Sequence, residues 1–327
     1  MEFPFHRSRR LRTNTSIRAI IEETSLSAAD FIMPVFVIEG EGKVEEINSM
    51  PGYYRRSIDK TVEELKMAMD KGIRAILLFV KVADDLKDNS GKESYNPDGL
   101  MQKAVFAIKK SMPTLIIMTD VALDPYSSYG HDGIVKGTKI VNDPTVEALV
   151  KMSISHAQAG ADFVAPSDMM DGRIVAIRKG LEAHSFPEVG IMSYSAKYSS
   201  CYYGPFRDAL DSAPGFGDKR TYQMNPANVE EAMREIQLDI NEGADIVMVK
   251  PAMTYLDVIY RAKEKYNFPI SAYQVSGEYA MIQLGIQSGL FSKKEIIWES
   301  LIAIKRAGAD LIASYFALDF IDINKGR

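Results

Sequence analysis

The sequence predicts an α/β fold, a (β/α)8 TIM barrel with an extended N-terminal arm. Eight short apolar runs alternate with helical stretches, and this number of units suits a closed barrel in a chain of 327 residues. A helix-ending glycine, a polar turn and a buried strand recur at Gly160-Ala-Asp, Gly243-Ala-Asp and Gly308-Ala-Asp. No G-x-G-x-x-G motif follows the early strands, and an open doubly wound sheet is the alternative.

The expected strands are the eight apolar runs. They occupy residues 31–38, 73–80, 114–121, 161–165, 189–195, 244–249, 269–275 and 309–315. Runs rich in Ile, Val and Met are typical of parallel strands buried on both faces. Two helices are expected to begin at Asp143-Pro144 and Asn225-Pro226, because each pair places a capping side chain before a proline at the first helical position.

Residues 1–30 are predicted to form an arm, and residues 31–327 a single catalytic barrel. Five arginines in the arm are interleaved with Ser and Thr, and the absence of a continuous apolar run argues against a secretory signal. Three glutamates argue against a transit peptide. We expect the arm to pack on a neighbouring subunit; the alternative is a frayed terminus.

The composition is that of an ordinary globular protein with 46% apolar residues. A net charge of −5 and a pI near 5.6 argue against a nucleic-acid-binding or membrane-surface protein. The longest apolar run is far shorter than the roughly 20 residues of a membrane span. The single cysteine, Cys201, excludes an internal disulfide and a zinc site made of several thiolates. We expect a cytoplasmic protein.

Two apolar runs each end in a lysine, Lys197 and Lys250. Adjacent strands lie only about 4.8 Å apart, so lysines at the ends of neighbouring strands would be close together. Like charge and apolar surroundings both favour the neutral amine, although bringing its pKa from about 10.4 to near 7 costs about 4–5 kcal/mol. A neutral lysine amine is a nucleophile for ketones. The alternative is a pair of lysines that extend to water from strand ends.

The active face of such a barrel is formed by the residues that follow each strand. The polar residues collected there are Asp120, Asp124, His131, Asp132, Ser167, Asp168, Asp171, Lys197, Lys250, Ser276, Glu278 and Tyr315. A long connection, residues 198–225, follows the fifth strand and is rich in Gly and Tyr; segments of this length are usually lids or binding loops. Its cations Arg207, Lys219 and Arg220 suit an anionic substrate, and a solvated surface loop is the alternative.

Several long motifs occur in order and cover nearly the whole chain. They include Asp120-Val-Ala-Leu-Asp-Pro-Tyr-Ser-Ser-Tyr-Gly-His-Asp-Gly133, Tyr203-Gly-Pro-Phe-Arg-Asp-Ala209, Val247-Met-Val-Lys-Pro-Ala252 and Tyr273-Gln-Val-Ser-Gly-Glu-Tyr279. On these motifs the chain resembles the 5-aminolevulinate dehydratase, or porphobilinogen synthase, family. The resemblance implies a lyase that condenses two molecules of 5-aminolevulinate to porphobilinogen with loss of water, in tetrapyrrole biosynthesis.

The resemblance also implies roles for individual residues. Lys250 would form the Schiff base at the propionate-side position and Lys197 the one at the acetate-side position. Ser276 and Tyr315 would hold the propionate-side carboxylate. Arg207, Lys219 and Gln223 would hold the other carboxylate, with Arg220 an equally cationic alternative to Lys219, and Phe206 would close a lid of about residues 199–224.

After the third strand, the chain differs from the zinc-dependent relatives. Where those relatives carry three cysteines, this chain has Ala122, Asp124 and Asp132, so it resembles the zinc-independent, magnesium-stimulated branch and no active-site zinc is expected. Asp124 and Asp132 are assigned to the catalytic group, where they would bind a cation or water, polarise substrate or transfer protons. Glu235 matches the position of an allosteric Mg²⁺ bound largely through waters. The family is typically a homo-octamer in which the arm embraces a neighbour.

Two other functions stay open. A class I aldolase is also a barrel with a lysine Schiff base, but it needs one such lysine. A non-catalytic binding protein on an enzyme-like scaffold, with its basic arm on nucleic acid, is the alternative from a different class.

Overall fold

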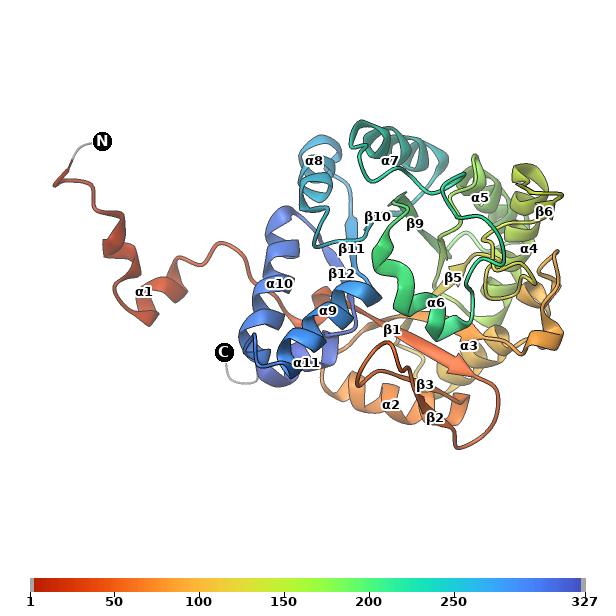
Figure 1. Cartoon of the computed structure of the whole chain (residues 1–327), viewed down its shortest axis with the longest axis horizontal. Helices are drawn as coiled ribbons and strands as arrows, with labels where there is room; N and C mark the ends of the chain where they lie inside the picture. The colour runs from red at the N-terminus through yellow and green to blue at the C-terminus, as the bar shows by residue number, and fades with distance from the viewer. Residues whose placement is uncertain (1–2, 325–327) are drawn as a thin grey trace.

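Eight parallel strands close into a barrel in the computed structural model, which describes residues 3–324 (Figure 1). They are β1 (Phe31–Ile38), β4 (Ala75–Lys81), β5 (Ile116–Val121), β8 (Phe163–Pro166), β9 (Gly190–Lys197), β10 (Ile246–Lys250), β11 (Ile270–Gln274) and β12 (Leu311–Ser314). Each overlaps its expected run. Strand β12 also pairs with β1, where Phe31 lies opposite Ile312, so the sheet has no open edge between them. The predicted barrel is confirmed, and the open sheet is wrong.

Helices surround the barrel. They are α2 (Ile58–Asp70), α3 (Leu100–Ser111), α4 (Asn142–Ala159), α5 (Arg173–Ala183), α6 (Gly204–Leu210), α7 (Glu230–Glu242), α8 (Leu256–Tyr266), α9 (Ser276–Gln287), α10 (Lys293–Ala307) and α11 (Ala317–Ile323). Short elements complete the described chain: hairpins β2–β3 (Val44–Glu46, Tyr54–Arg56) and β6–β7 (Val135–Lys136, Lys139–Ile140), and 3-10 turns η1 (Ser8–Arg12), η2 (Ala28–Asp30), η3 (Asp84–Leu86), η4 (Lys92–Tyr95) and η5 (Cys201–Tyr203).

The repeated Gly-Ala-Asp turns have one structural role. In each, the glycine ends a helix in the left-handed conformation, with φ of 105°, 105° and 119° in chain order. The aspartate carboxylate then accepts a hydrogen bond from a backbone N–H near the start of the preceding barrel strand. The pairs are Asp162 with Ile117 (2.7 Å), Asp245 with Ile191 (2.8 Å) and Asp310 with Ile270 (2.8 Å). The repeat therefore fastens neighbouring strands together at the end of the barrel away from their carboxyl ends.

The predicted helix starts need correction. Helix α7 begins at Glu230, and Asn225 lies in a turn where its side chain accepts a hydrogen bond from the backbone of Ala227. The Asn225 side chain therefore caps a local turn and not the helix, so the Asn-Pro pair does not start α7. Helix α4 begins at Asn142, which places Asp143 inside the first turn rather than at the cap.

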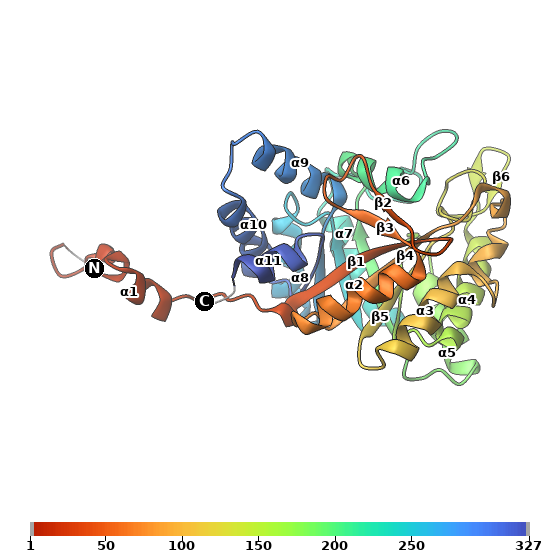
Figure 2. The same cartoon turned by 90° about the horizontal axis from the view of Figure 1, so that it is seen from below.

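The N-terminal segment lies apart from the barrel. Helix α1 (Thr15–Ile20) extends to one side in both views (Figures 1 and 2). Apolar side chains of the N-terminal segment are uncovered in the single chain: Phe3, Phe5 and Ile20 are 74%, 83% and 82% exposed. Among residues 3–324, no helix has the length and apolar character needed to cross a membrane.

Candidate active site

Two lysines stand side by side at the carboxyl end of the barrel. Strands β9 and β10 pair in parallel with Lys197 opposite Lys250. This pairing depends on a bulge, because the register shifts by one residue between Val247 and Val249. Side chains alternate between the two faces of a strand, so in unbroken register Lys197 and Lys250 would point to opposite faces. The bulge brings both amines to the same side.

The amine of Lys250 is enclosed by aromatic rings. The ring centroids of Tyr194, Tyr203, Phe206 and Tyr273 lie 5.0, 5.1, 4.9 and 4.7 Å from its Nζ. Among the described residues, no carboxylate forms an ion pair with it. Burial, together with the charge of Lys197, lowers the pKa of Lys250 to about 7. A large fraction of this amine is therefore neutral, and nucleophilic, at neutral pH.

Lys197 has a different environment, because it is ion-paired. Its Nζ donates hydrogen bonds to Asp132 Oδ2 at 2.9 Å and to the carbonyl of Ser167. Lys219 Nζ reaches the other oxygen of Asp132 at 2.5 Å and Asp124 Oδ2 at 3.2 Å. Burial acts to raise the pKa of Asp132, but the two lysines hold it well below its usual range. Asp132 is thus a fixed negative charge between two ammonium groups.

A second acid, Asp120, lies inside β5 and is buried. Burial and repulsion from Asp124 raise its pKa to about 7, although Lys197 and Lys250 oppose the shift. The sequence analysis placed Asp120 on the active face but assigned it no role. The available signal was an aspartate inside an otherwise apolar strand.

The side chains expected on the propionate side lie next to Lys250. Ser276 is the first residue of α9, and its Oγ accepts a hydrogen bond from the backbone N–H of Phe206 at 2.9 Å. The hydroxyl of Tyr315 lies 2.9 Å from that of Tyr273. Both Phe206 and Tyr273 also contact the Lys250 amine. Figure 2 shows α6 and α9 at the same end of the barrel.

The lid residues expected to bind the second carboxylate differ in orientation. Lys219 is 5% exposed and points inward, whereas the Arg220 side chain is 78% exposed and pairs with Asp218. Gln223 is buried, and its Oε1 has no hydrogen-bond partner among the described residues. Arg207 is partly exposed on α6. The geometry therefore favours Lys219 over Arg220 as the inward cation.

Three other polar residues of the active face do not join the lysines. Asp168 faces Arg173, with Oδ2 3.6 Å from Nε; burial raises the pKa of Asp168 to about 6, and Arg173 opposes the shift. The carboxylate of Glu278 accepts two backbone N–H bonds of 2.7 Å, at the start of α9 and after β10. Asp171 is exposed and is held through its backbone by Asn142.

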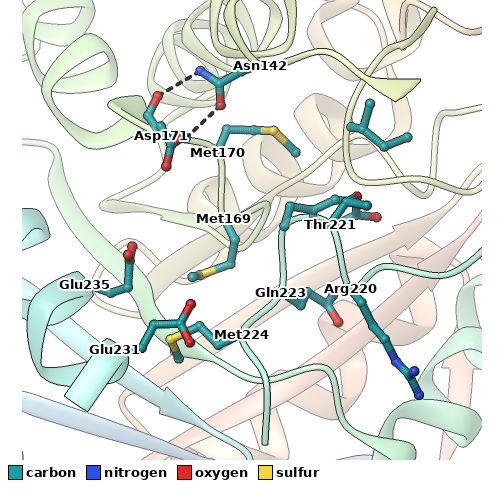
Figure 3. Close-up of a pocket in the computed structure, with 12 residues that line it drawn as sticks. Asn142, Met169, Met170, Asp171, Arg220, Thr221, Gln223, Met224, Glu231 and Glu235 are labelled. Atoms are coloured by element: carbon teal, nitrogen blue, oxygen red, sulfur yellow. Dashed lines mark hydrogen bonds between the residues drawn. The ribbon is translucent and has the colours of Figure 1, made fainter. Parts of the chain in front are cut away.

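Glu235 lies on α7 and lines a cleft of about 310 Å³ (Figure 3). Glu231 lines the same cleft one helical turn earlier, and Asp171 lies across it. Burial raises the pKa of Glu235, while the nearby Arg173 lowers it. The cleft thus gathers carboxylates around a small volume.

The oxygen donors of this cleft and of Asp124 and Asp132 are hard ligands, which suit Mg²⁺ better than zinc. Within residues 3–324, no group of three or more His, Cys, Asp or Glu side chains is arranged to hold a metal directly. Both carboxylate oxygens of Asp132, and Oδ2 of Asp124, are already engaged by lysine ammonium groups. An ion at Glu235 would need water for most of its ligands.

Comparisons with known proteins give a consistent result. The family model described as delta-aminolevulinic acid dehydratase matches residues 5–323. The dehydratase of Methanothermus sociabilis is 53% identical over 322 residues, covering 98% of this chain and 99% of its own. That of Synechococcus elongatus is 49% identical, covering 97% and 98%. A Toxoplasma gondii dehydratase in complex with its reaction product, porphobilinogen, superimposes with a TM-score of 0.95 at 48% identity, covering 97% of this chain and 91% of that one.

Proposed function

The chain belongs to the delta-aminolevulinic acid dehydratase family, and we infer that it is a porphobilinogen synthase, a lyase that condenses two molecules of 5-aminolevulinate with loss of water. Tetrapyrrole biosynthesis is the pathway that this reaction serves. The observation that carries the inference is the pairing of Lys197 with Lys250 in one barrel mouth. Two adjacent amines suit a reaction that joins two keto substrates.

We propose that Lys250 forms the propionate-side Schiff base. Its neutral amine attacks the keto carbon, a C–N bond forms, and the keto oxygen leaves as water. The aromatic rings around the amine exclude bulk water from this bond. A pKa of about 7 supports the role, because the nucleophile is present without a separate base to deprotonate it.

Lys197 is proposed to hold the acetate-side substrate. Its Nζ is ion-paired with Asp132, so this amine, unlike that of Lys250, is engaged by a carboxylate before substrate arrives. Asp132 is a weak base because Lys197 and Lys219 lower its pKa. Asp120 is better suited to accept and return protons, since its pKa lies near 7 and it interacts electrostatically with both Schiff-base lysines. We therefore propose that Asp124 and Asp132 hold Lys197 and Lys219 in place as negative charges, and that Asp120 transfers protons.

The substrate carboxylates are proposed to bind at two groups of side chains. Ser276 and Tyr315 would bind the propionate-side carboxylate, and Phe206 of α6 would cover the substrate between them and Lys250. Arg207, Lys219 and Gln223 would bind the second carboxylate, to which Gln223 would donate from its Nε2–H₂ group. The buried Oε1 of Gln223 has no partner among the described residues and would accept from a substrate amine or from water.

We propose that Mg²⁺ binds in the cleft at Glu235 and acts as an allosteric activator. The carboxylates of Glu231 and Glu235 would hold its hydration shell, and the ion would add positive charge beside α7. Helix α7 also carries Asp239, which contacts Arg173 and, in β9, Ser193, so the helix that bears Glu235 packs against an active-site strand.

We also propose a homo-octamer in which the N-terminal arm packs on a neighbouring subunit. The uncovered apolar side chains of Phe3, Phe5 and Ile20 support this assembly, because a single chain leaves them in water. The division into an arm of residues 1–30, a barrel of residues 31–327 and a lid of about residues 199–224 belongs to the same proposal. A cytoplasmic location stays a prediction from composition.

Porphobilinogen formation from 5-aminolevulinate tests the function. The full-length protein is assayed in chelator, then with Mg²⁺ or zinc restored; borohydride trapping and peptide mapping locate the substrate adducts. We expect turnover, stimulation by Mg²⁺ and adducts at both Lys197 and Lys250.

Adducts at one lysine, without porphobilinogen, would favour a class I aldolase. Absence of any adduct or turnover would favour the binding-protein alternative. Restoration by zinc and not Mg²⁺ would contradict the metal assignment.

A further inference from the structure

One buried imidazole connects the loop after β5 to the lid. His131 is 1% exposed, and both of its ring nitrogens face lid residues. Nε2 lies 3.0 Å from the carbonyl oxygen of Phe216, and Nδ1 lies 3.1 Å from the hydroxyl of Tyr222. A carbonyl only accepts, so Nε2 carries a hydrogen and donates to Phe216, while Nδ1 pairs with the Tyr222 hydroxyl. Both hydrogen-bonding positions of the ring are therefore used on the lid.

The backbone on either side of His131 also contacts the lid. Gly215 N–H donates to the carbonyl of Tyr129 at 2.9 Å, and Asp132 N–H donates to the Tyr222 hydroxyl at 3.3 Å. Gly130, at φ +64°, faces the lid so closely that an added Cβ would lie 2.1 Å from the carbonyl oxygen of Ala213. A side chain at residue 130 would thus push the lid away.

The two lid residues held by His131 stand on either side of Lys219 in the chain. Lys219 in turn places its ammonium on Asp132, the residue next to His131. The next turn is fixed as well, because Gln223 N–H donates to the Lys219 carbonyl at 2.9 Å. One imidazole therefore fastens both ends of the lid segment that carries the inward cation.

We propose that His131 is a positioning residue that clamps lid residues 216–222 and so holds Lys219 and Gln223 ready for a substrate carboxylate. We call Gly130, His131, Phe216 and Tyr222 the clasp. The inference rests on the proposed function, in which Lys219 and Gln223 bind substrate. Among the described residues, the hydrogen bonds of His131 go to the lid and not to Lys197 or Lys250, so the clasp would act through the lid.

The first test replaces His131→Phe, which keeps a ring against Phe216 and removes both nitrogens. Loss of both hydrogen bonds is expected to raise KM for 5-aminolevulinate about tenfold or more, with a smaller change in kcat. Borohydride trapping at Lys250 should persist at saturating substrate. His131→Asn and His131→Gln each offer a polar group near one nitrogen position and should give intermediate KM values.

Hydrogen exchange gives a readout that is independent of turnover. In His131→Phe, the backbone amides of residues 213–223 should exchange faster, while those of the barrel strands keep the wild-type rate. If the chain makes no porphobilinogen, the proposed function fails and exchange still tests the clasp. Wild-type KM, or unchanged lid exchange, in a folded His131→Phe protein overturns the proposal.

Two glycine variants provide a second test in case His131→Phe does not fold. Gly130 and Gly137 have the same φ of +64°, but an added Cβ at Gly137 meets nothing within 4 Å. Alanine at either position carries a similar backbone strain, because φ is the same. Gly130→Ala should raise KM and speed lid exchange, and Gly137→Ala should do neither. Equal behaviour of the two variants contradicts the clasp.

Discussion

Replacing Lys197 by methionine tests whether its ammonium helps keep Lys250 neutral. Two ammonium groups on adjacent strands, about 5 Å apart, repel by about 3 kcal/mol at an effective dielectric constant near 20. One pKa unit corresponds to about 1.4 kcal/mol, so the repulsion amounts to at most about 2 units. We expect the pKa of Lys250 to rise by about 1 to 2 units. It should stay below 10.5, because burial is the larger cause of the lowered pKa and is unchanged.

The assay follows the first Schiff base. Wild-type protein and Lys197→Met are incubated briefly with 5-aminolevulinate over a range of pH, reduced with borohydride, and the adduct on Lys250 is quantified by peptide mapping. The wild-type rate should rise with pH through a midpoint near 7, where the amine loses its proton. The variant should show the same rise at higher pH, with a slower rate at pH 7.

A matched control removes a lysine charge elsewhere. Lys136 is exposed in the β6–β7 hairpin, so Lys136→Met changes the net charge equally and should leave the midpoint in place. An unchanged or lower midpoint in Lys197→Met would refute the argument that like charge lowers the pKa of Lys250. A midpoint near 10.5 would instead show that burial contributes little.

Three further predictions follow from single side chains. Lys250→Met should abolish turnover, raise the unfolding free energy at pH 7 by up to about 5 kcal/mol and so raise the melting temperature; a lower melting temperature would contradict this. The reason is that the folded pKa of Lys250, about 7, lies below the unfolded value of 10.5, so burying the charged amine destabilises the folded protein. This destabilisation is full below pH 7 and disappears as the pH rises to 10.5. Glu235→Gln should weaken Mg²⁺ stimulation several-fold with little effect on activity in chelator, measured as porphobilinogen formation against Mg²⁺ concentration; unaltered stimulation would place the ion elsewhere. Asp310→Asn should lower the unfolding free energy by about 1–2 kcal/mol in denaturant titrations, because a carboxylate shared by the Ile270 N–H and Lys263 is lost; a neutral result would remove the role assigned to the repeat.

Two features of the active site could not be predicted from the sequence pattern. Asp120 was visible only as an aspartate in an apolar strand, and its raised pKa depends on burial and on Asp124, which no spacing displays. The sequence could not decide between Lys219 and Arg220, because both are cations in consecutive lid positions and only the folded backbone sets which side chain points inward. The structure orients Lys219 toward Asp132 and leaves Arg220 in water.

The sequence by itself determined the barrel, because buried parallel strands are continuous apolar runs and Gly-Ala-Asp marks the return to the sheet at three of the eight strands. It also placed Lys197 and Lys250 at the ends of their strands. Only the tertiary structure decided that the two amines point the same way, since a bulge in strand register depends on partners and not on local pattern. The same holds for the ion pairs of Asp132 and the His131 clasp, which join residues about 65 to 90 positions apart through contacts that only folding creates.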